Sequence, residues 1–153
     1  MTNQEIQQIV SSWSELLEFS EEASEFLNIT VPKELLLEIC TKLRNTEGLD
    51  FDYLFCLTGI DYGDKLGIIY HLESIEQSHN IVVKVTTENR EEPILDSVCQ
   101  IWRTAEFHEM EVFDFFGITF KNHPNMKRLF LPPEWDGYPL RKDYEDEANM
   151  VIK

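Results

Sequence analysis

The chain has 153 residues, of which 42% are hydrophobic and 12% aromatic, a composition typical of a folded domain rather than a disordered one. Its formal charge of −16 argues against nucleic-acid binding, because neutralising phosphates requires clustered lysine and arginine. No apolar run approaches the ~18 residues of a membrane span and no secretory signal is visible, so we expect membrane attachment only through a partner.

The N-terminal third predicts two helices with a strand between them. Apolar residues at helical spacing predict an amphipathic helix over residues 2–19, with Thr2 and Glu5 in the positions of a capping box. Residues 25–31 read as a short strand, and Pro32 suits the first position of a second helix that ends near residues 45–48.

Three strands are predicted in the middle of the chain. Apolar and polar residues alternate over residues 51–60, 66–73 and 81–87, with turn residues between them. Strands joined this closely pair as an antiparallel meander. Together with the flanking helices they predict an α+β fold, in which helices cover a mixed, largely antiparallel sheet.

A long helix is then predicted to start at Pro93 and to continue through residues 105–116. Glu109 falls on the apolar arc of this helix, where a buried carboxylate requires a cation or hydrogen-bond donors. In an alternative interpretation the helix breaks near Ala105 and Glu109 is exposed. The basic residues nearest to Glu109 in the C-terminal part of the sequence are Arg128, Arg141 and Lys142.

Helical periodicity ends at Gly117, and four of the six prolines lie between residues 124 and 139. Proline removes backbone donors and restricts the preceding residue, so we expect an α+β domain over residues 1–117 and an extended segment over residues 118–153. That segment carries aromatic residues and a net positive charge over residues 121–142. Such a composition suits either a partner-binding strip or a segment folded back on its own domain, and the two are compatible.

A metal-dependent hydrolase is a competing hypothesis, because Glu106, His108 and Glu109 could converge on one ion. A solvated acidic helix face is the more ordinary interpretation of these residues. The chain has no glycine-rich nucleotide motif and no cysteine pairing suited to iron–sulfur clusters, so we expect no cofactor, metal or catalytic residue in the chain itself. A stand-alone interaction domain is a third possibility.

A series of motifs runs from the predicted helix to the C-terminal segment: Glu109-Met110-Glu111-Val112-Phe113-Asp114-Phe115-Phe116-Gly117-Ile118, Phe120, His123-Pro124, Lys127-Arg128-Leu129, Pro132, Trp135 and Gly137-Tyr138-Pro139-Leu140-Arg141-Lys142-Asp143-Tyr144. These motifs closely resemble those of the 30-kDa (C-type) subunit of respiratory complex I, NADH:quinone oxidoreductase. Two positions depart from the family pattern: Met110 replaces a usual arginine, and Asn125 stands where aspartate is common.

The resemblance implies a structural subunit without a redox centre. It would dock through its C-terminal segment on the large 49-kDa-type (D-type) subunit and contact other peripheral-arm subunits at the cytoplasmic face of the cell inner membrane. NADH, FMN, Fe–S clusters and quinone would belong to the complex, which moves protons. Related subunits also occur in membrane-bound [NiFe] hydrogenases and in quinone dehydrogenases with other donors.

The resemblance also implies a set of structural and interface residues. Three carboxylates would hold the helix and the C-terminal segment in register, four cations would pair with them, and three apolar residues would anchor the segment. These are Glu109, Glu111 and Asp114; Lys127, Arg128, Arg141 and Lys142; and Trp135, Tyr138 and Leu140, with His123 and Asp143 completing the set.

Overall fold

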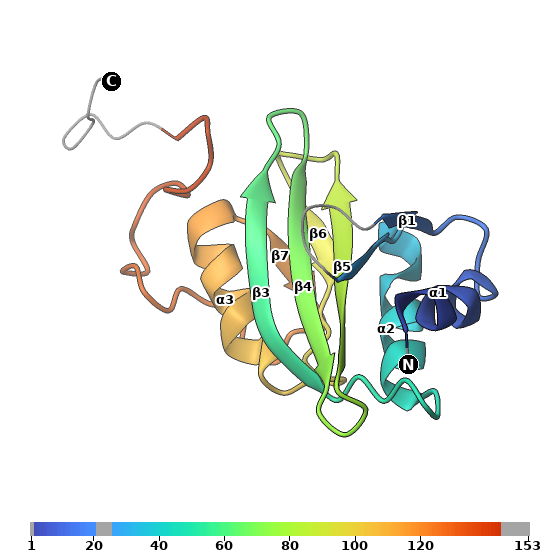
Figure 1. Ribbon diagram of the computed structural model, residues 1–153. Helices are drawn as coiled ribbons and strands as arrows, with labels where there is room; N and C mark the ends of the chain where they lie inside the picture. Colours follow the sequence, from blue (N-terminus) through green and yellow to red (C-terminus); the bar gives the residue numbers. More distant parts are fainter. Residues whose placement is uncertain (1, 21–25, 145–153) are drawn as a thin grey trace.

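The computed structural model describes residues 2–20 and 26–144. A five-stranded sheet has the order β1-β2-β5-β4-β3, in which only β2 and β5 pair in parallel (Figure 1). A separate parallel pair joins β6 and β7. The strands are β1 (Glu18–Ser20), β2 (Leu27–Thr30), β3 (Tyr53–Asp61), β4 (Leu66–Ser74), β5 (His79–Thr87), β6 (Ile94–Asp96) and β7 (Thr119–Lys121).

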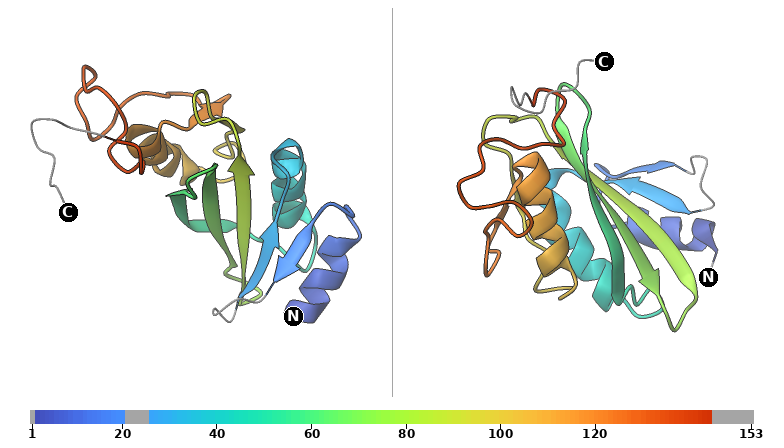
Figure 2. Two further views of the ribbon diagram at one scale, coloured as in Figure 1. Left: turned by 90° about the horizontal axis from the view of Figure 1, so that it is seen from above. Right: turned by 90° about the vertical axis from the view of Figure 1, so that its left-hand side faces the viewer.

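The helical elements are α1 (Asn3–Ser11), the short 3-10 helix η1 (Lys33–Leu35), α2 (Leu36–Asn45) and α3 (Ala105–Phe116). α2, α3 and the β6–β7 pair lie on one face of the large sheet (Figures 1 and 2). The predicted α+β class, with its mixed and mostly antiparallel sheet, is confirmed.

The first predicted helix is too long, since α1 ends at Ser11 instead of continuing to residue 19. Thr2 caps the helix as expected, because its hydroxyl accepts the amide hydrogen of Glu5 at 3.2 Å. At the other end Ser12 donates its hydroxyl to the carbonyl of Ile9, and the hydroxyl of Ser14 accepts from the amide of Leu16. Serine side chains that bond nearby backbone groups offer the chain an alternative to the helix, and they end it here.

The helix predicted from Pro93 is wrong in its first part. Ile94–Asp96 form β6, successive turns follow, and α3 starts at Ala105. The amide of Thr119 donates to the carbonyl of Pro93, and Leu95 pairs with Phe120. This strand depends on a partner some 25 residues away in the sequence, which a local helical pattern does not reveal.

The core lies between the large sheet and the helices that cover one of its faces. Leu54, Tyr70 and Val83 of the sheet are 0% exposed, as are Leu36 and Leu43 of α2, and Val112 and Phe116 of α3 are also buried. On the opposite face Tyr53 and Phe55 of β3 remain 39% and 38% exposed. α3 therefore packs against the large sheet through β3, and its C-terminal end leads into β7 and the segment that follows.

Candidate functional site

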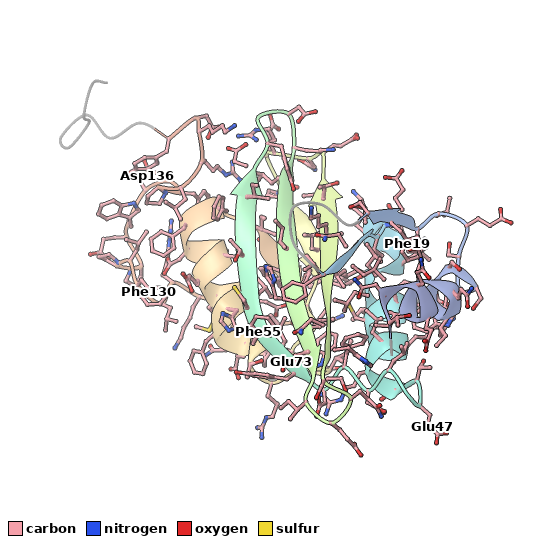
Figure 3. All side chains as sticks on the ribbon, in the orientation of Figure 1. Phe19, Glu47, Phe55, Glu73, Phe130 and Asp136 are labelled. Atoms are coloured by element: carbon pink, nitrogen blue, oxygen red, sulfur yellow. The ribbon has the colours of Figure 1, made fainter. Side chains whose placement is uncertain are left out.

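Residues 122–144, which we call the tail, contain no helix or strand and run along the outer side of α3 (Figures 1 and 3). Figure 3 shows Phe130 and Asp136 of the tail at the margin of the molecule beyond α3. Within the predicted extended segment, Thr119–Lys121 form β7. Residues 145–153, the last part of the predicted segment, lie outside the described residues.

Asp114 of α3 organises the first turn of the tail. Its side chain is 0% exposed, and Oδ2 accepts the amide hydrogens of Leu129, Phe130 and Leu131 at 2.9, 2.6 and 3.2 Å. Burial raises the pKa of Asp114, but these three bonds and the Arg128 guanidinium outweigh burial and leave the pKa below its usual range. Asp114 is thus a buried, ionised anchor for the chain that follows it.

The tail also caps the C-terminal end of α3. Helix ends leave four carbonyl groups without intrahelical partners, and here each of the last four finds a donor. Arginine near a helix C-terminus also interacts favourably with the helix dipole. The carbonyl of Phe113 accepts from the Gly117 amide, Asp114 from Arg128 Nη1 at 2.6 Å, Phe115 from the Leu140 amide at 2.9 Å and Phe116 from Arg141 Nε at 2.6 Å.

Arg128 joins this helix end to a second turn of the tail. Its Nη2 donates to the carbonyls of Trp135 and Gly137 at 3.1 and 2.9 Å, and its Nη1 lies 3.3 Å from Asp114 Oδ1. The guanidinium also stands 4.8 Å from the ring centroid of Tyr138, and Arg141 approaches the same ring at 5.2 Å. The two predicted cations therefore hold backbone carbonyls and an aromatic ring as well as a carboxylate.

The end of the tail is attached to the sheet by residues that the sequence did not single out. Asp61, at the end of β3, accepts a bidentate pair from Arg90 at 2.6 and 2.9 Å and the backbone amide of Lys142 at 2.9 Å. Arg90 Nη2 also reaches Asp143 at 3.3 Å. The Arg90 hydrogen bond holds the pKa of Asp61 well below its usual range. The charged pair lies 29 residues apart in sequence, so no local sequence pattern indicates it.

Glu109 is buried as its position on the apolar arc predicted, although α3 begins at Ala105 as in the alternative interpretation. Its predicted pairing with tail cations is wrong. Oε1 accepts from the Ser97 hydroxyl at 2.5 Å and Oε2 from the Val98 amide at 2.9 Å. Burial raises the pKa of Glu109 to about 7, against the effect of these two hydrogen bonds.

The other predicted residues fall into two groups. Glu111, Lys127, Lys142 and Asp143 are exposed, and Leu140 is 56% exposed. Trp135 and Tyr138 are partly buried, and His123 is partly buried as a residue although its side chain is fully covered. Glu106 and His108 are each partly buried and do not join Glu109 in a ligand set. Within residues 2–20 and 26–144 no three His, Cys, Asp or Glu side chains are grouped so that they could hold a metal ion.

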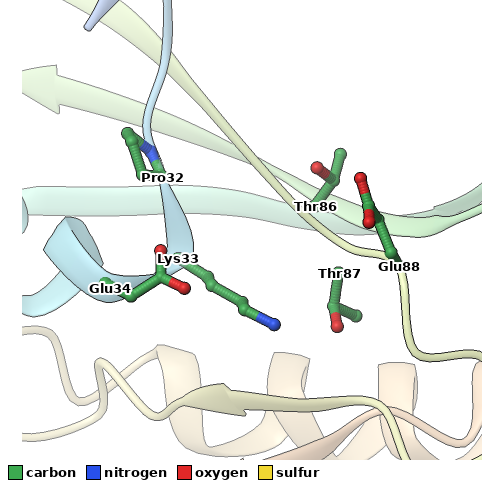
Figure 4. A pocket seen from close by; sticks show the side chains of 6 residues that line it. All are labelled: Pro32, Lys33, Glu34, Thr86, Thr87 and Glu88. Atoms are coloured by element: carbon green, nitrogen blue, oxygen red, sulfur yellow. The ribbon is translucent and has the colours of Figure 1, made fainter. Parts of the chain in front are cut away.

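Surface hollows lie both on the tail and away from it. One of about 280 Å³ opens among residues 136–144 and is lined by Tyr138, Arg141 and Asp143. Another, of about 380 Å³, lies between the start of η1 and the end of β5, where Lys33 extends in the direction of Thr87 (Figure 4). None of the predicted site residues lines this second hollow.

Comparison with known proteins identifies the family. The model of the family described as "Respiratory-chain NADH dehydrogenase, 30 Kd subunit" matches residues 29–149. The chain belongs to this family. No described helix of this 30-kDa-type chain is long and apolar enough to span a membrane.

Relatives in the family are named as subunits of one enzyme, NADH-quinone oxidoreductase. The C/D-type subunit of Phocaeicola vulgatus is 52% identical over 80% of this chain and 24% of its own length. The C-type subunit of Chloroherpeton thalassium is 48% identical over 67% of this chain and 43% of its own length. The C-type subunit of Roseiflexus castenholzii is 37% identical over 84% of this chain and 77% of its own length. The chain therefore spans less than half the length of the first two relatives.

A solved structure shares the fold. A chain in the membrane-bound sulfane sulfur reductase, an archaeal respiratory membrane complex, superposes with a TM-score of 0.80 over 95% of this chain and 86% of its own. The sequence identity is 23%, so this likeness bears on the fold alone.

Proposed function

We propose that this chain is a non-redox structural subunit of a complex I-type NADH:quinone oxidoreductase, and that its tail docks on the large 49-kDa-type subunit. The observation that carries the proposal is the exposure of Leu129, Phe130 and Leu140 by 39%, 60% and 56% on a tail whose backbone is anchored to α3 and β3. A binding segment that is already ordered loses less conformational entropy when a partner binds.

Two further observations support the 49-kDa-type, or D-type, subunit as the partner. The Phocaeicola vulgatus and Bacteroides fragilis relatives are named as C/D-type subunits, so that one name joins the two. The hollow among residues 136–144 belongs to the same stretch of the tail as the exposed Leu140 and offers room for a partner side chain. Apolar anchors that meet a concave surface are typical of protein interfaces.

In this proposal the chemistry belongs to the complex. NADH, FMN, Fe–S clusters and quinone are held by other subunits of the peripheral arm, and this chain positions the 49-kDa-type subunit at the cytoplasmic face of the inner membrane. The complex as a whole moves protons and is the oxidoreductase. The alternative is the equivalent place in a complex with another donor, such as a membrane-bound [NiFe] hydrogenase.

Affinity capture of the tagged chain from gently solubilised membranes tests the proposal. Phe130→Ser and Leu140→Ser should lower the recovery of the 49-kDa-type subunit by ~10-fold or more, the effect of losing about 1.4 kcal/mol or more at an interface hot spot. Ile75→Ser is the matched control, because Ile75 is also exposed, at 62%, but lies in the turn between β4 and β5. Undiminished recovery with both tail variants would contradict docking through this face.

Substitutions of the two cations at the end of the tail distinguish an effect on docking from an effect on folding. The side chain of Lys142 is exposed, whereas Arg141 holds the Phe116 carbonyl and the Tyr138 ring. Lys142→Glu should weaken capture while leaving the thermal stability of the isolated chain unchanged, and Arg141→Glu should lower both. Mass-spectrometric identification of the captured subunits then reports which electron donor the complex uses.

A further inference from the structure

A third hollow, of about 510 Å³, opens between the C-terminal end of α2 and the turns that lead into α3. Both of its walls lie at the lower end of the molecule in Figures 1 and 2. The tail caps the opposite end of α3 and contributes no residue to this hollow. The lining residues are Thr41, Arg44, Asn45, Gln100, Ile101 and Arg103.

The chain has five arginines, and the two that do not hold the tail line this hollow together. Arg90, Arg128 and Arg141 are taken up by the hydrogen bonds that attach the tail. Arg44 and Arg103 are exposed, and their side chains form no hydrogen bond or ion pair with any residue that the structure describes. Although the chain has a net charge of −16, no acid is among the described residues that line the hollow. The hollow therefore presents positive charge that the described chain does not neutralise.

The two walls of the hollow are tied together through Phe51. Its amide donates to the carbonyl of Leu43 in α2 at 3.1 Å, and its carbonyl accepts from the indole nitrogen of Trp102 at 2.8 Å. All three residues are buried. Arg44 follows Leu43 directly in the sequence, and Arg103 follows Trp102. The backbone that carries both arginines is thus fixed before any partner binds, which lowers the entropy lost on binding.

The side chains that line the hollow suit an oxyanion. A guanidinium is planar and presents its N–H donors in a fork that fits two oxygens of a carboxylate or a phosphate at once. Two such groups stand in one hollow, and the side chains of Thr41, Asn45 and Gln100 add hydroxyl and amide donors. The hollow is therefore equipped to bind one or more acidic groups.

The end of α2 favours a polypeptide over a phosphate group, whether free or on a lipid. The last four carbonyls of a helix have no intrahelical partner. Here those of Arg44 and Asn45 accept no hydrogen bond from the described residues. A phosphate dianion brings oxygens that the negative end of the helix dipole repels. An acidic segment of a protein brings carboxylates for the arginines together with backbone N–H groups for the carbonyls.

We propose that this hollow is a second docking surface, which takes an acidic segment of another subunit, with an aspartate or glutamate side chain of that segment bound by Arg44 and Arg103. The proposal rests on the proposed place of the chain in a complex, but not on docking through the tail. The chain then contacts its neighbours at both ends of α3, through the tail at one end and through the arginine pair at the other.

Zero-length crosslinking of the assembled complex tests this surface. Arg44→Lys and Arg103→Lys each keep the positive charge and place a primary amine in the hollow. A carbodiimide joins an amine to a carboxylate only where the two groups are in contact. In the complex purified from gently solubilised membranes through a tag on this chain, we expect both variants to form an amide crosslink to an aspartate or glutamate of the same neighbouring subunit, identified by mass spectrometry.

Gln7→Lys is the matched control, because Gln7 is exposed on α1 and does not line the hollow, and it should not form that crosslink. The second docking surface is ruled out if neither arginine variant is joined to another subunit, including the case of a chain recovered alone, or if the amines react only with carboxylates of this chain. An adduct with the mass of phosphate or of a phospholipid would identify a different occupant and also overturn the proposal. Failure of tail docking is measured separately with Phe130→Ser and Leu140→Ser, which leave the hollow unaltered.

Discussion

The ring of Tyr138 lies so close to Gly117 that a Cβ on the glycine would come within 2.6 Å of it. Gly117 is the C-cap of α3 and has a φ of +76°, a conformation that favours glycine at the ends of helices. The glycine thus both ends the helix and leaves room for the ring that Arg128 and Arg141 enclose.

Gly117→Ala should destabilise the chain by ~1–3 kcal/mol, because strain at positive φ is added to displacement of the ring. Urea unfolding followed by circular dichroism measures the free energy of unfolding. Gly63→Ala is a control for the backbone strain alone, since Gly63 has a φ of +97° and nothing within 4 Å of the added Cβ. Equal losses in the two variants would show that the contact with Tyr138 contributes nothing.

Asp114→Asn should loosen the tail more than it unfolds the domain. An amide retains one acceptor oxygen but loses the charge that strengthens the three amide bonds and the contact with Arg128. Faster tryptic cleavage after Lys127 is the expected result, measured by mass spectrometry over time. Glu111→Gln, on the exposed side of the same helix, should be cleaved at the rate of the unaltered chain.

Arg90 and Asp61 should be strongly coupled in a double-mutant cycle. Asp61 has a side chain that is only 2% exposed, so Arg90→Gln leaves a buried carboxylate with its two amide donors and no bidentate cation. We expect a coupling energy of ~1–3 kcal/mol from the stabilities of Arg90→Gln, Asp61→Asn and the double variant. A coupling energy near zero would mean that the pair does not hold the end of the tail to the sheet.

Acid should weaken the attachment of the tail through Asp61 and Asp114. Both carboxyl groups have pKa values below their ordinary ones, so the stability they contribute is fully present above the unfolded-state pKa, ~4, and is lost as the pH falls through the lower folded-state values. Unfolding free energies measured from pH 5 down to pH 2 should decrease, and the decrease should be shallower in Asp114→Asn.

Glu109 changes the free energy of unfolding in the opposite direction from Asp61 and Asp114, and it does so at higher pH. Its folded-state pKa of about 7 lies above the ordinary value of 4.5, so its stabilising effect is complete below pH 4.5 and is lost as the pH rises through 7. Glu109→Gln should therefore lose less stability than the unaltered chain between pH 5 and pH 8. Parallel stability curves for the two proteins over that range would contradict a raised pKa.

Elements whose apolar pattern is local were predicted well from the sequence. The alternation in β3, β4 and β5 and the turns between them identified three strands that the structure contains nearly residue for residue. The position of Glu109 among apolar residues also predicted its burial. In these cases the spacing of apolar residues along the chain is enough to predict which face of the strand or helix packs against the core.

Features that depend on distant partners could not be predicted in this way. The apolar spacing after Pro93 predicted a helix where the structure has β6, a strand that forms by pairing with β7. Asp61 and Arg90 showed no pattern of their own, although they attach the end of the tail. The sequence indicated that a buried Glu109 would need a cation or hydrogen-bond donors but not which groups, and the fold supplies a serine hydroxyl and a backbone amide.

The sequence by itself determined the α+β class, the family motifs and the set of carboxylates and cations along α3 and the tail. Only the tertiary structure decided which of these groups meet. Local periodicity fixes which residues are buried, but the partners of a buried charge depend on how segments far apart in the chain are brought together. That is why the Asp114 carboxylate and the last three carbonyls of α3 are satisfied by the tail, while the Glu109 carboxyl is satisfied by Ser97 and Val98.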